Sequence, residues 1–205
     1  MNILVTGGLG LIGHNVVNLL QAQGHQVCVI DNHTTYGIIP QEEINCLMTE
    51  RYKKLKEDTY VYNDDITDNH AVKRIFDIEQ PEIVIHMASF PRQKVVNANP
   101  QLGADVMMRG LINLLESAKR HGVRRFVYIS SSMVYGDFKD TYFDGIDENH
   151  ACRPIGQYGI MKLTGEWLVH DYWRRTGLTY TIIRPSAVYG PLDVSAMILC
   201  LLAAL

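Results

Sequence analysis

Tyr158 and Lys162 stand four residues apart in the segment YGIMK and could together carry acid–base chemistry. On a helix, this spacing places both side chains on one face. A phenol ionises at about pH 10, too high for a base at neutral pH, and a nearby ammonium group favours the phenolate and lowers the pKa of the phenol. The pair alone leaves a second interpretation open, in which the helix buries an aromatic ring and holds its lysine in solvent.

Hydroxyl groups gather in the segment ISSSMVYG, where an apolar run of the sequence ends. A serine there could hydrogen-bond a substrate hydroxyl or carbonyl group and steer its proton toward Tyr158. Serines at the end of a strand also form turns. The segment therefore indicates a site only together with other signals.

Gly7, Gly10 and Gly13 stand three residues apart in the segment TGGLGLIG. They follow a short apolar run and precede residues with helical spacing, so we expect them in a turn from a strand to a helix. Such a turn lets the backbone approach a phosphate group, and the helix N-terminus offers free N–H groups and the positive end of a dipole. The alternative is a turn that only packs a helix on a strand.

Asp31 ends the second apolar run, close to the spacing of roughly 20 residues after a glycine-rich turn at which an acid binds an adenosine ribose. A carboxylate there would repel a 2′-phosphate, so NAD is favoured over NADP. Asp65 and Ile66 follow the third run, where a carboxylate could meet the adenine amino group. The alternatives are an exposed turn at Asp31 and a loop-initiating aspartate at Asp65.

Short apolar segments alternate with helical patterns along the chain. The expected strands are residues 3–5, 26–31, 59–63, 82–88, 125–132 and 179–185. They are nearly continuous in apolar residues, as parallel strands covered on both faces are. The order indicates an α/β fold, a Rossmann-type doubly wound parallel sheet with helices on both faces. Such sheets bind ligands beyond the carboxyl ends of their strands.

Helical spacing is clearest in three stretches. The first follows the glycines and is expected to end near Gly24, with an apolar face of Ile12, Val16, Leu19 and Leu20. The other two are residues 101–121 and 157–176. The segments 32–58 and 136–156 are expected to be long polar loops, which in such folds are more often functional than idle.

The overall composition argues against several function classes. The 205 residues carry a formal net charge of −3, which gives a nucleic-acid partner no electrostatic support. No cysteine or histidine spacing indicates a metal site, and we expect the four cysteines to be reduced and mostly buried. No signal peptide precedes the first apolar run, which predicts a cytoplasmic protein.

The last eleven residues, SAMILCLLAAL, are strongly apolar. They are too few to span a membrane, which takes roughly 20 residues, so no membrane partner is expected. Three interpretations remain open: a buried helix, an association surface, or the cut end of a longer chain.

Taken together, these motifs resemble the extended short-chain dehydrogenase/reductase family, especially its NAD-dependent nucleotide-sugar epimerases and dehydratases, including enzymes like UDP-glucose 4-epimerase. The similarity covers nearly the whole chain. The matching segments are TGGLGLIG, DNHTT, DDITD, HMAS, GLINLLESAKRHGVRRFVYISSSMVYG, PIGQYGIMKLTGE and IIRPSAVYGP. Each segment is weak alone, but the ordered set is specific.

The resemblance implies roles by position. Tyr158 would transfer the proton, Ser131 would be the catalytic serine, and Lys162 would hold the nicotinamide ribose and tune the tyrosine. Ser131, Ser132 and Tyr158 would contact the substrate. The implied NAD contacts are Gly7, Gly10, Leu11, Ile12 and Gly13 at the pyrophosphate, Asp31 and Asn32 at the adenosine ribose, Asp65 and Ile66 at the adenine, Met87, Ala88 and Ser89 in a loop lining the cofactor, and Tyr158 with Lys162.

Departures from the family pattern narrow this interpretation. Dehydratases of the family carry an Asp-Glu pair directly after the catalytic serine or threonine, and this chain has Ser132 and Met133 there. Neither residue can supply the acid and base for water loss. Met107 and Ala187 stand where the family usually has an asparagine near the cofactor and one near the substrate.

The resemblance also implies an organisation. Residues 1–190 would form the NAD-binding Rossmann domain, and residues 191–205 an apolar tail that could begin a truncated substrate-binding domain. The helices at 101–121 and 157–176 form a four-helix dimer interface in the family, so we expect a homodimer.

The implied function is NAD-dependent epimerisation of a nucleotide sugar, a UDP- or dTDP-hexose, by transient hydride transfer to bound NAD. One alternative is a net NAD-dependent dehydrogenase or reductase of another hydroxyl or carbonyl substrate. The other is a truncated, non-catalytic dinucleotide-binding module.

Overall fold

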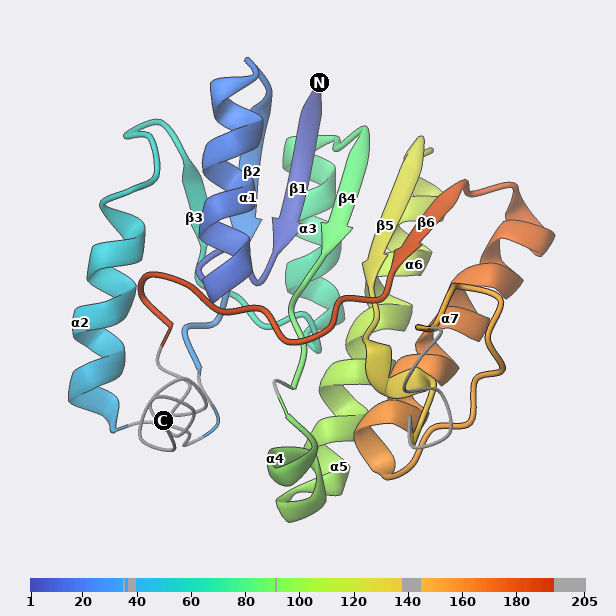
Figure 1. Ribbon diagram of the computed structural model, residues 1–205. Helices are drawn as coiled ribbons and strands as arrows, with labels where there is room; N and C mark the ends of the chain where they lie inside the picture. Colours follow the sequence, from blue (N-terminus) through green and yellow to red (C-terminus); the bar gives the residue numbers. More distant parts are fainter. Residues whose placement is uncertain (35, 37–39, 91, 138–144, 194–205) are drawn as a thin grey trace.

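The computed structural model describes residues 1–34, 36, 40–90, 92–137 and 145–193, which form one sheet of six parallel strands (Figure 1). The strands are β1 (Asn2–Thr6), β2 (Gln26–Ile30), β3 (Tyr60–Tyr62), β4 (Ile83–His86), β5 (Arg125–Ile129) and β6 (Tyr180–Ile183). Their order across the sheet is β3-β2-β1-β4-β5-β6. The direction of winding therefore reverses between β1 and β4, which is where such sheets bind ligands.

Helices cover both faces of this sheet (Figure 1). In chain order the helical segments are α1 (Leu11–Ala22), α2 (Gln41–Tyr52), α3 (Asn69–Glu79), α4 (Gln93–Ala98), α5 (Pro100–Ala104), the π-helical turn η1 (Asp105–Arg109), α6 (Gly110–Arg120), the 3-10 turn η2 (Ser132–Val134) and α7 (Gln157–Thr176). The expected Rossmann-type α/β fold is confirmed.

Alternate residues of the strands feed two separate cores. Ile3 and Val5 of β1 pack on one face of the sheet with Val17 of α1. Leu4, between them, packs on the other face in the core that α3, α6 and α7 cover, where it shares a cluster with Leu111. Because both faces of the sheet are buried at β1, successive residues of the strand are apolar rather than alternating with polar ones.

The expectation that residues 32–58 form a loop is wrong, because α2 lies within them. Ile44 and Leu47 are buried on one side of this helix, and acidic residues in its first turn complement the helix dipole. The helix is polar on average, so its short apolar stripe did not stand out from the surrounding polar residues.

The apolar face expected for α1 matches its buried face only in part, since Leu20 packs against the core. Ile12 and Leu19 are exposed, whereas Gly13, His14 and Val17 are buried. The reason is the close approach of α1 to the glycine-rich turn, which turns the small side of the helix inward rather than its most apolar side.

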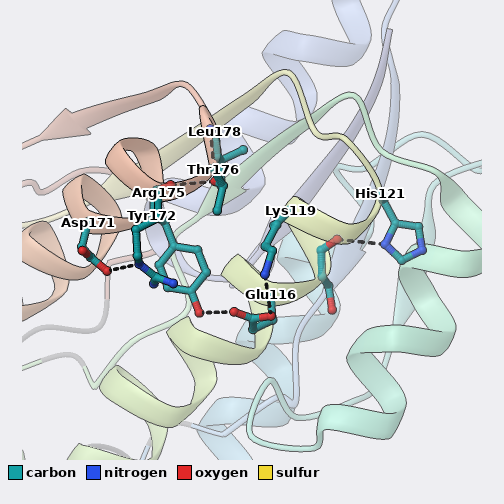
Figure 2. Close-up of polar contacts among 9 residues, drawn as sticks. Glu116, Lys119, His121, Asp171, Tyr172, Arg175, Thr176 and Leu178 are labelled. Carbon is teal, nitrogen blue, oxygen red and sulfur yellow. Dashed lines mark hydrogen bonds and ion pairs between the residues drawn. The ribbon is translucent and has the colours of Figure 1, made fainter.

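The helix expected at 101–121 is interrupted by η1, where the backbone takes the wider π-helical turn. Beyond it, α6 lies against α7. Figure 2 shows the polar contact between them, a 2.6 Å hydrogen bond from the Tyr172 hydroxyl to Glu116. Arg175 lies over the Tyr172 ring, 4.7 Å from its centroid. The bond to Glu116 ties α6 to α7, the helix that carries Tyr158 and Lys162.

Every strand points its carboxyl end to the same edge of the sheet (Figure 1). After β6 the chain follows this edge back toward α2, where the Leu192 carbonyl accepts a 2.8 Å hydrogen bond from Arg51. Residues 194–205, most of the apolar tail, lie outside the described residues. No helix in the described part of the chain is long and apolar enough to cross a membrane.

Cys28, Cys46 and Cys152 are free thiols, and Cys200 lies outside the described residues. The expectation that the cysteines are mostly buried is wrong for the three that are described, since Cys46 is exposed and Cys152 half-buried.

Candidate active site

The glycine-rich turn joins β1 to α1 at the carboxyl edge. Gly7 adopts a positive φ of 71°, and its N–H donates to the Ile30 carbonyl of β2 at 2.8 Å. Gly10 is the N-cap residue of α1 and provides no side-chain cap. Its N–H donates to the Gly7 carbonyl at 3.0 Å. The first-turn N–H groups of α1 therefore face the edge of the sheet without partners inside the helix, as an anion site requires.

Close packing explains why this turn needs glycine. A Cβ atom on Gly13 would overlap the Gly7 carbonyl oxygen and lie 2.8 Å from Gly8 Cα. A Cβ atom on Gly7 would lie 2.7 Å from the Ala88 nitrogen in the loop after β4. The turn is thus held against both its own helix and the neighbouring strand's loop.

Asp31 lies directly after β2 and supports the same turn. Its carboxylate accepts hydrogen bonds of 2.9 Å from the N–H groups of Leu9 and His33. Arg51 of α2 approaches from the other side and donates to the Leu9 carbonyl at 2.9 Å. Burial lowers the pKa of Arg51, and the nearby Asp31 opposes this shift. Asp31 therefore has a structural role in the turn besides the predicted contact with a ribose.

Asn32 and Asp65 follow β2 and β3 and lie in contact with each other. The Asn32 amide donates to Asp65 at 2.7 Å, and the other oxygen of Asp65 accepts from Thr67 N–H at 2.8 Å. Ile66 is buried, and its carbonyl accepts from the Asn113 amide of α6. The residues predicted to contact adenine are therefore held in place by hydrogen bonds to neighbouring segments.

The loop after β4 lies beside the glycine-rich turn, at the place where the winding of the sheet reverses between β1 and β4. Met87 N–H donates to the Thr6 carbonyl at 3.1 Å, and Ala88 N–H donates to the Thr6 hydroxyl at 3.2 Å. That hydroxyl also shares a 2.7 Å hydrogen bond with the buried His86. Met87, Ala88 and Ser89 are all half-buried, and Met87 and Ala88 pack against the cores on the two faces of the sheet.

Ser131, Tyr158 and Lys162 converge where β5 meets α7. Ser131 follows β5, and its hydroxyl accepts from Met133 N–H at 3.2 Å, which starts the turn η2. Lys162 is buried and donates to the Ile129 carbonyl at 2.7 Å, with its amine 5.8 Å from the centroid of the Tyr158 ring. Ser132 donates its N–H to the Pro185 carbonyl and leaves its side chain half-buried at the edge.

The electrostatics of this group differ from the sequence prediction in one respect. Burial raises the pKa of Tyr158 above its usual value, and the hydrogen bond with Ser131 is what opposes the rise. Burial also lowers the pKa of Lys162 to about 7, opposed by the charge of Glu166. In this structure the lysine is therefore the more strongly perturbed member of the pair.

Several residues of the site escaped the sequence analysis. The buried Glu166 and the half-buried Arg184 form an ion pair with Nη2–Oε2 at 2.7 Å, and the Ser130 hydroxyl donates to the same carboxylate. Arg51 at the glycine-rich turn was also missed. The signal available for Glu166 was its place one helical turn after Lys162; Arg184 and Arg51 give no local signal, because their partners are distant in the sequence.

Three positions that depart from the family pattern carry side chains without acid–base groups. Met107 is buried within η1, and Met133 lies in η2 and donates its backbone N–H to the Ser131 hydroxyl. Ala187 is exposed on the segment that follows β6. None of the three side chains can donate or accept a proton.

The sequence matches the NAD dependent epimerase/dehydratase family over residues 3–205. A putative UDP-glucose 4-epimerase of Methanocaldococcus jannaschii is 33% identical over 192 residues, which cover 92% of this chain and 56% of that protein. The chain thus spans little more than half of this relative's length.

Among the similar solved structures are two epimerases. The UDP-glucose 4-epimerase of Thermotoga maritima, solved with UDP-glucose, has a TM-score of 0.79 at 32% identity and is matched over 93% of this chain and 57% of that one. The UDP-glucuronic acid 4-epimerase of Bacillus cereus, in complex with UDP-glucuronic acid and NAD, has a TM-score of 0.81 at 27% identity, over 94% of this chain and 59% of that one. The chain therefore belongs to the NAD dependent epimerase/dehydratase family.

Proposed function

We propose that this chain is the NAD-binding part of a nucleotide-sugar epimerase acting on a UDP- or dTDP-hexose. The observation that carries the proposal is the convergence of Ser131, Tyr158 and Lys162 beyond the carboxyl ends of the strands, on the same edge as the glycine-rich turn. Residues 1–190 form the NAD-binding domain in this proposal, and residues 191–205 begin the part that binds the rest of the substrate.

In this proposal each part of NAD has its own group of residues. The N-terminus of α1 is suited to the pyrophosphate, Asp31 and Asn32 to the adenosine ribose, and Asp65 with Ile66 to the adenine. Lys162 is placed to hold the nicotinamide ribose once its amine leaves the Ile129 carbonyl. When bound, NAD supplies the hydride acceptor and donor.

The protein's own residues handle the proton. Tyr158 takes the proton of the sugar hydroxyl at the carbon to be oxidised and returns it after the sugar has turned over in the site. Ser131 and Ser132 orient the sugar oxygen. Because Ser132 and Met133 replace an acidic pair, the chain lacks the groups that water loss would need there, which favours epimerisation over dehydration.

A single-turnover assay tests this function. The protein is mixed with NAD and UDP-glucose, the sugar is followed by NMR, and NADH is followed by absorbance. We expect a C4-epimerised sugar with only transient NADH. Stoichiometric release of NADH would instead support a net dehydrogenase. The observation that favours this alternative is the exposed Ala187, whose methyl group stands where the family pattern has an asparagine amide that contacts the substrate. Bound NAD with neither signal would support a non-catalytic module.

A homodimer is the expected assembly. Large apolar side chains stand exposed along the outer faces of α5–α6 and α7, namely Leu102, Ile112, Ile160 and Trp167, the last 65% exposed. Light scattering at micromolar concentration should give twice the chain mass, and Trp167→Asp should shift the protein toward the monomer. Leu19→Asp, at an exposed apolar residue on the far helix α1, is the matched control. A monodisperse wild-type monomer would contradict the proposal.

A further inference from the structure

Three consecutive residues at the end of β5 are each joined to the helix α7. The Ile129 carbonyl accepts from Lys162 at 2.7 Å, and the Ser130 hydroxyl donates to Glu166 at 2.5 Å. Ser131 hydrogen-bonds Tyr158. The three partners on α7, Tyr158, Lys162 and Glu166, are spaced by four residues and so lie on one face of the helix, although they do not follow the order of the residues they meet.

Glu166 is the most heavily bonded of these partners. Its Oε1 accepts from Ser130 and from Arg184 Nε at 2.9 Å, and its Oε2 accepts from Arg184 Nη2 at 2.7 Å. Arg184 also donates to the Tyr135 hydroxyl at 2.9 Å and to the Glu148 carbonyl. The Glu166 side chain is only 5% exposed, and the Arg184 guanidinium is its ion-pair partner.

The Glu166 carboxylate also acts on the Lys162 amine, as the surroundings of that amine show. The amine lies 5.5 Å from the ring centroid of Tyr128 on β5 and 5.8 Å from that of Tyr158. His86 of β4 faces it, but burial lowers the pKa of His86 to about 3, so that ring is neutral. Glu166 carries the negative charge that acts on this amine.

We propose that Glu166 is a positioning residue for the Ser131–Tyr158–Lys162 group: it fixes the end of β5 against α7 through Ser130 and supplies the charge that favours the protonated form of the Lys162 amine. The proposal rests on the proposed function for its catalytic meaning, but not for the ionisation of Lys162. A neutral amine could still donate to a ribose, but only the protonated amine favours the Tyr158 phenolate through its charge. The Glu166 carboxylate therefore matters most for the acid–base role of the pair.

NMR titration of the Lys162 side chain, labelled with ¹³C at Cε and assigned with Lys162→Met, tests the proposal directly. We expect Glu166→Gln to lower the midpoint of the Lys162 titration by roughly one pH unit, the scale of a nearby opposite charge. Burial already lowers the pKa of Lys162 to about 7, so losing the carboxylate leaves the amine mostly neutral at pH 7. Asp171→Asn, at an exposed carboxylate on the same helix, should leave the midpoint unchanged.

Ser130→Ala separates the two parts of the role and remains informative if Glu166→Gln does not fold. It keeps the carboxylate and removes the link to the strand end, so the Lys162 midpoint should stay while the affinity for NAD falls several-fold. Wild-type affinity in Ser130→Ala would overturn the link, and an unchanged midpoint in folded Glu166→Gln would overturn the charge. Both readouts need no turnover, so a failed epimerase assay leaves this test intact.

Discussion

Tyr158→Phe is expected to lower the turnover number by at least roughly 10²–10⁴-fold, the usual contribution of general acid–base catalysis, while NAD stays bound. The phenylalanine ring keeps the contacts that Tyr158 makes with the core and with the Lys162 amine. What is lost is the hydroxyl that hydrogen-bonds Ser131 and carries the transferable proton.

The measurement is the single-turnover conversion of UDP-glucose, with NAD affinity determined in parallel by calorimetry. Tyr60→Phe is the matched control, because Tyr60 is an exposed residue of β3 and its hydroxyl lies outside the proposed site. Turnover of Tyr158→Phe near the wild-type rate would reduce Tyr158 to a packing residue. Loss of NAD binding in this variant would show that the hydroxyl serves the cofactor more than the proton.

The parts of the site that the sequence predicts are those whose signals are local. The glycines, Asp31 and the Tyr158–Lys162 pair each combine a residue type with a short spacing, and the strands that carry them are marked by continuous apolar runs. The topology then brings these segments to one edge of the sheet, so fold class and site location follow from one pattern.

What the sequence does not predict depends on contacts between distant segments. Arg184 meets Glu166 only because β6 lies beside β5, and Arg51 reaches the glycine-rich turn only because α2 folds over it. The pKa of Tyr158 is a further case. The spacing to Lys162 predicts a lowered value, whereas burial, a property of the packed structure, raises it.

Gly13→Ala is expected to have the largest effect on the cofactor site. The new methyl group would overlap the Gly7 carbonyl oxygen and press on the Gly8 backbone, and neither can rotate away as a side chain would. The turn must then open from the N-terminus of α1. We expect a loss of about 1–3 kcal/mol in stability, typical of overpacking, and at least a roughly tenfold weaker affinity for NAD.

Gly10→Ala is the comparison that isolates this clash. A Cβ atom there would lie 3.1 Å from the same Gly7 oxygen, a contact that a shift of a few tenths of an ångström relieves. Thermal unfolding without NAD should therefore place Gly10→Ala close to the wild type and Gly13→Ala well below it. If Gly13→Ala matched the wild type in both unfolding temperature and NAD affinity, the helix would not need to approach the turn so closely. Gly13 would then have no part in shaping an anion site.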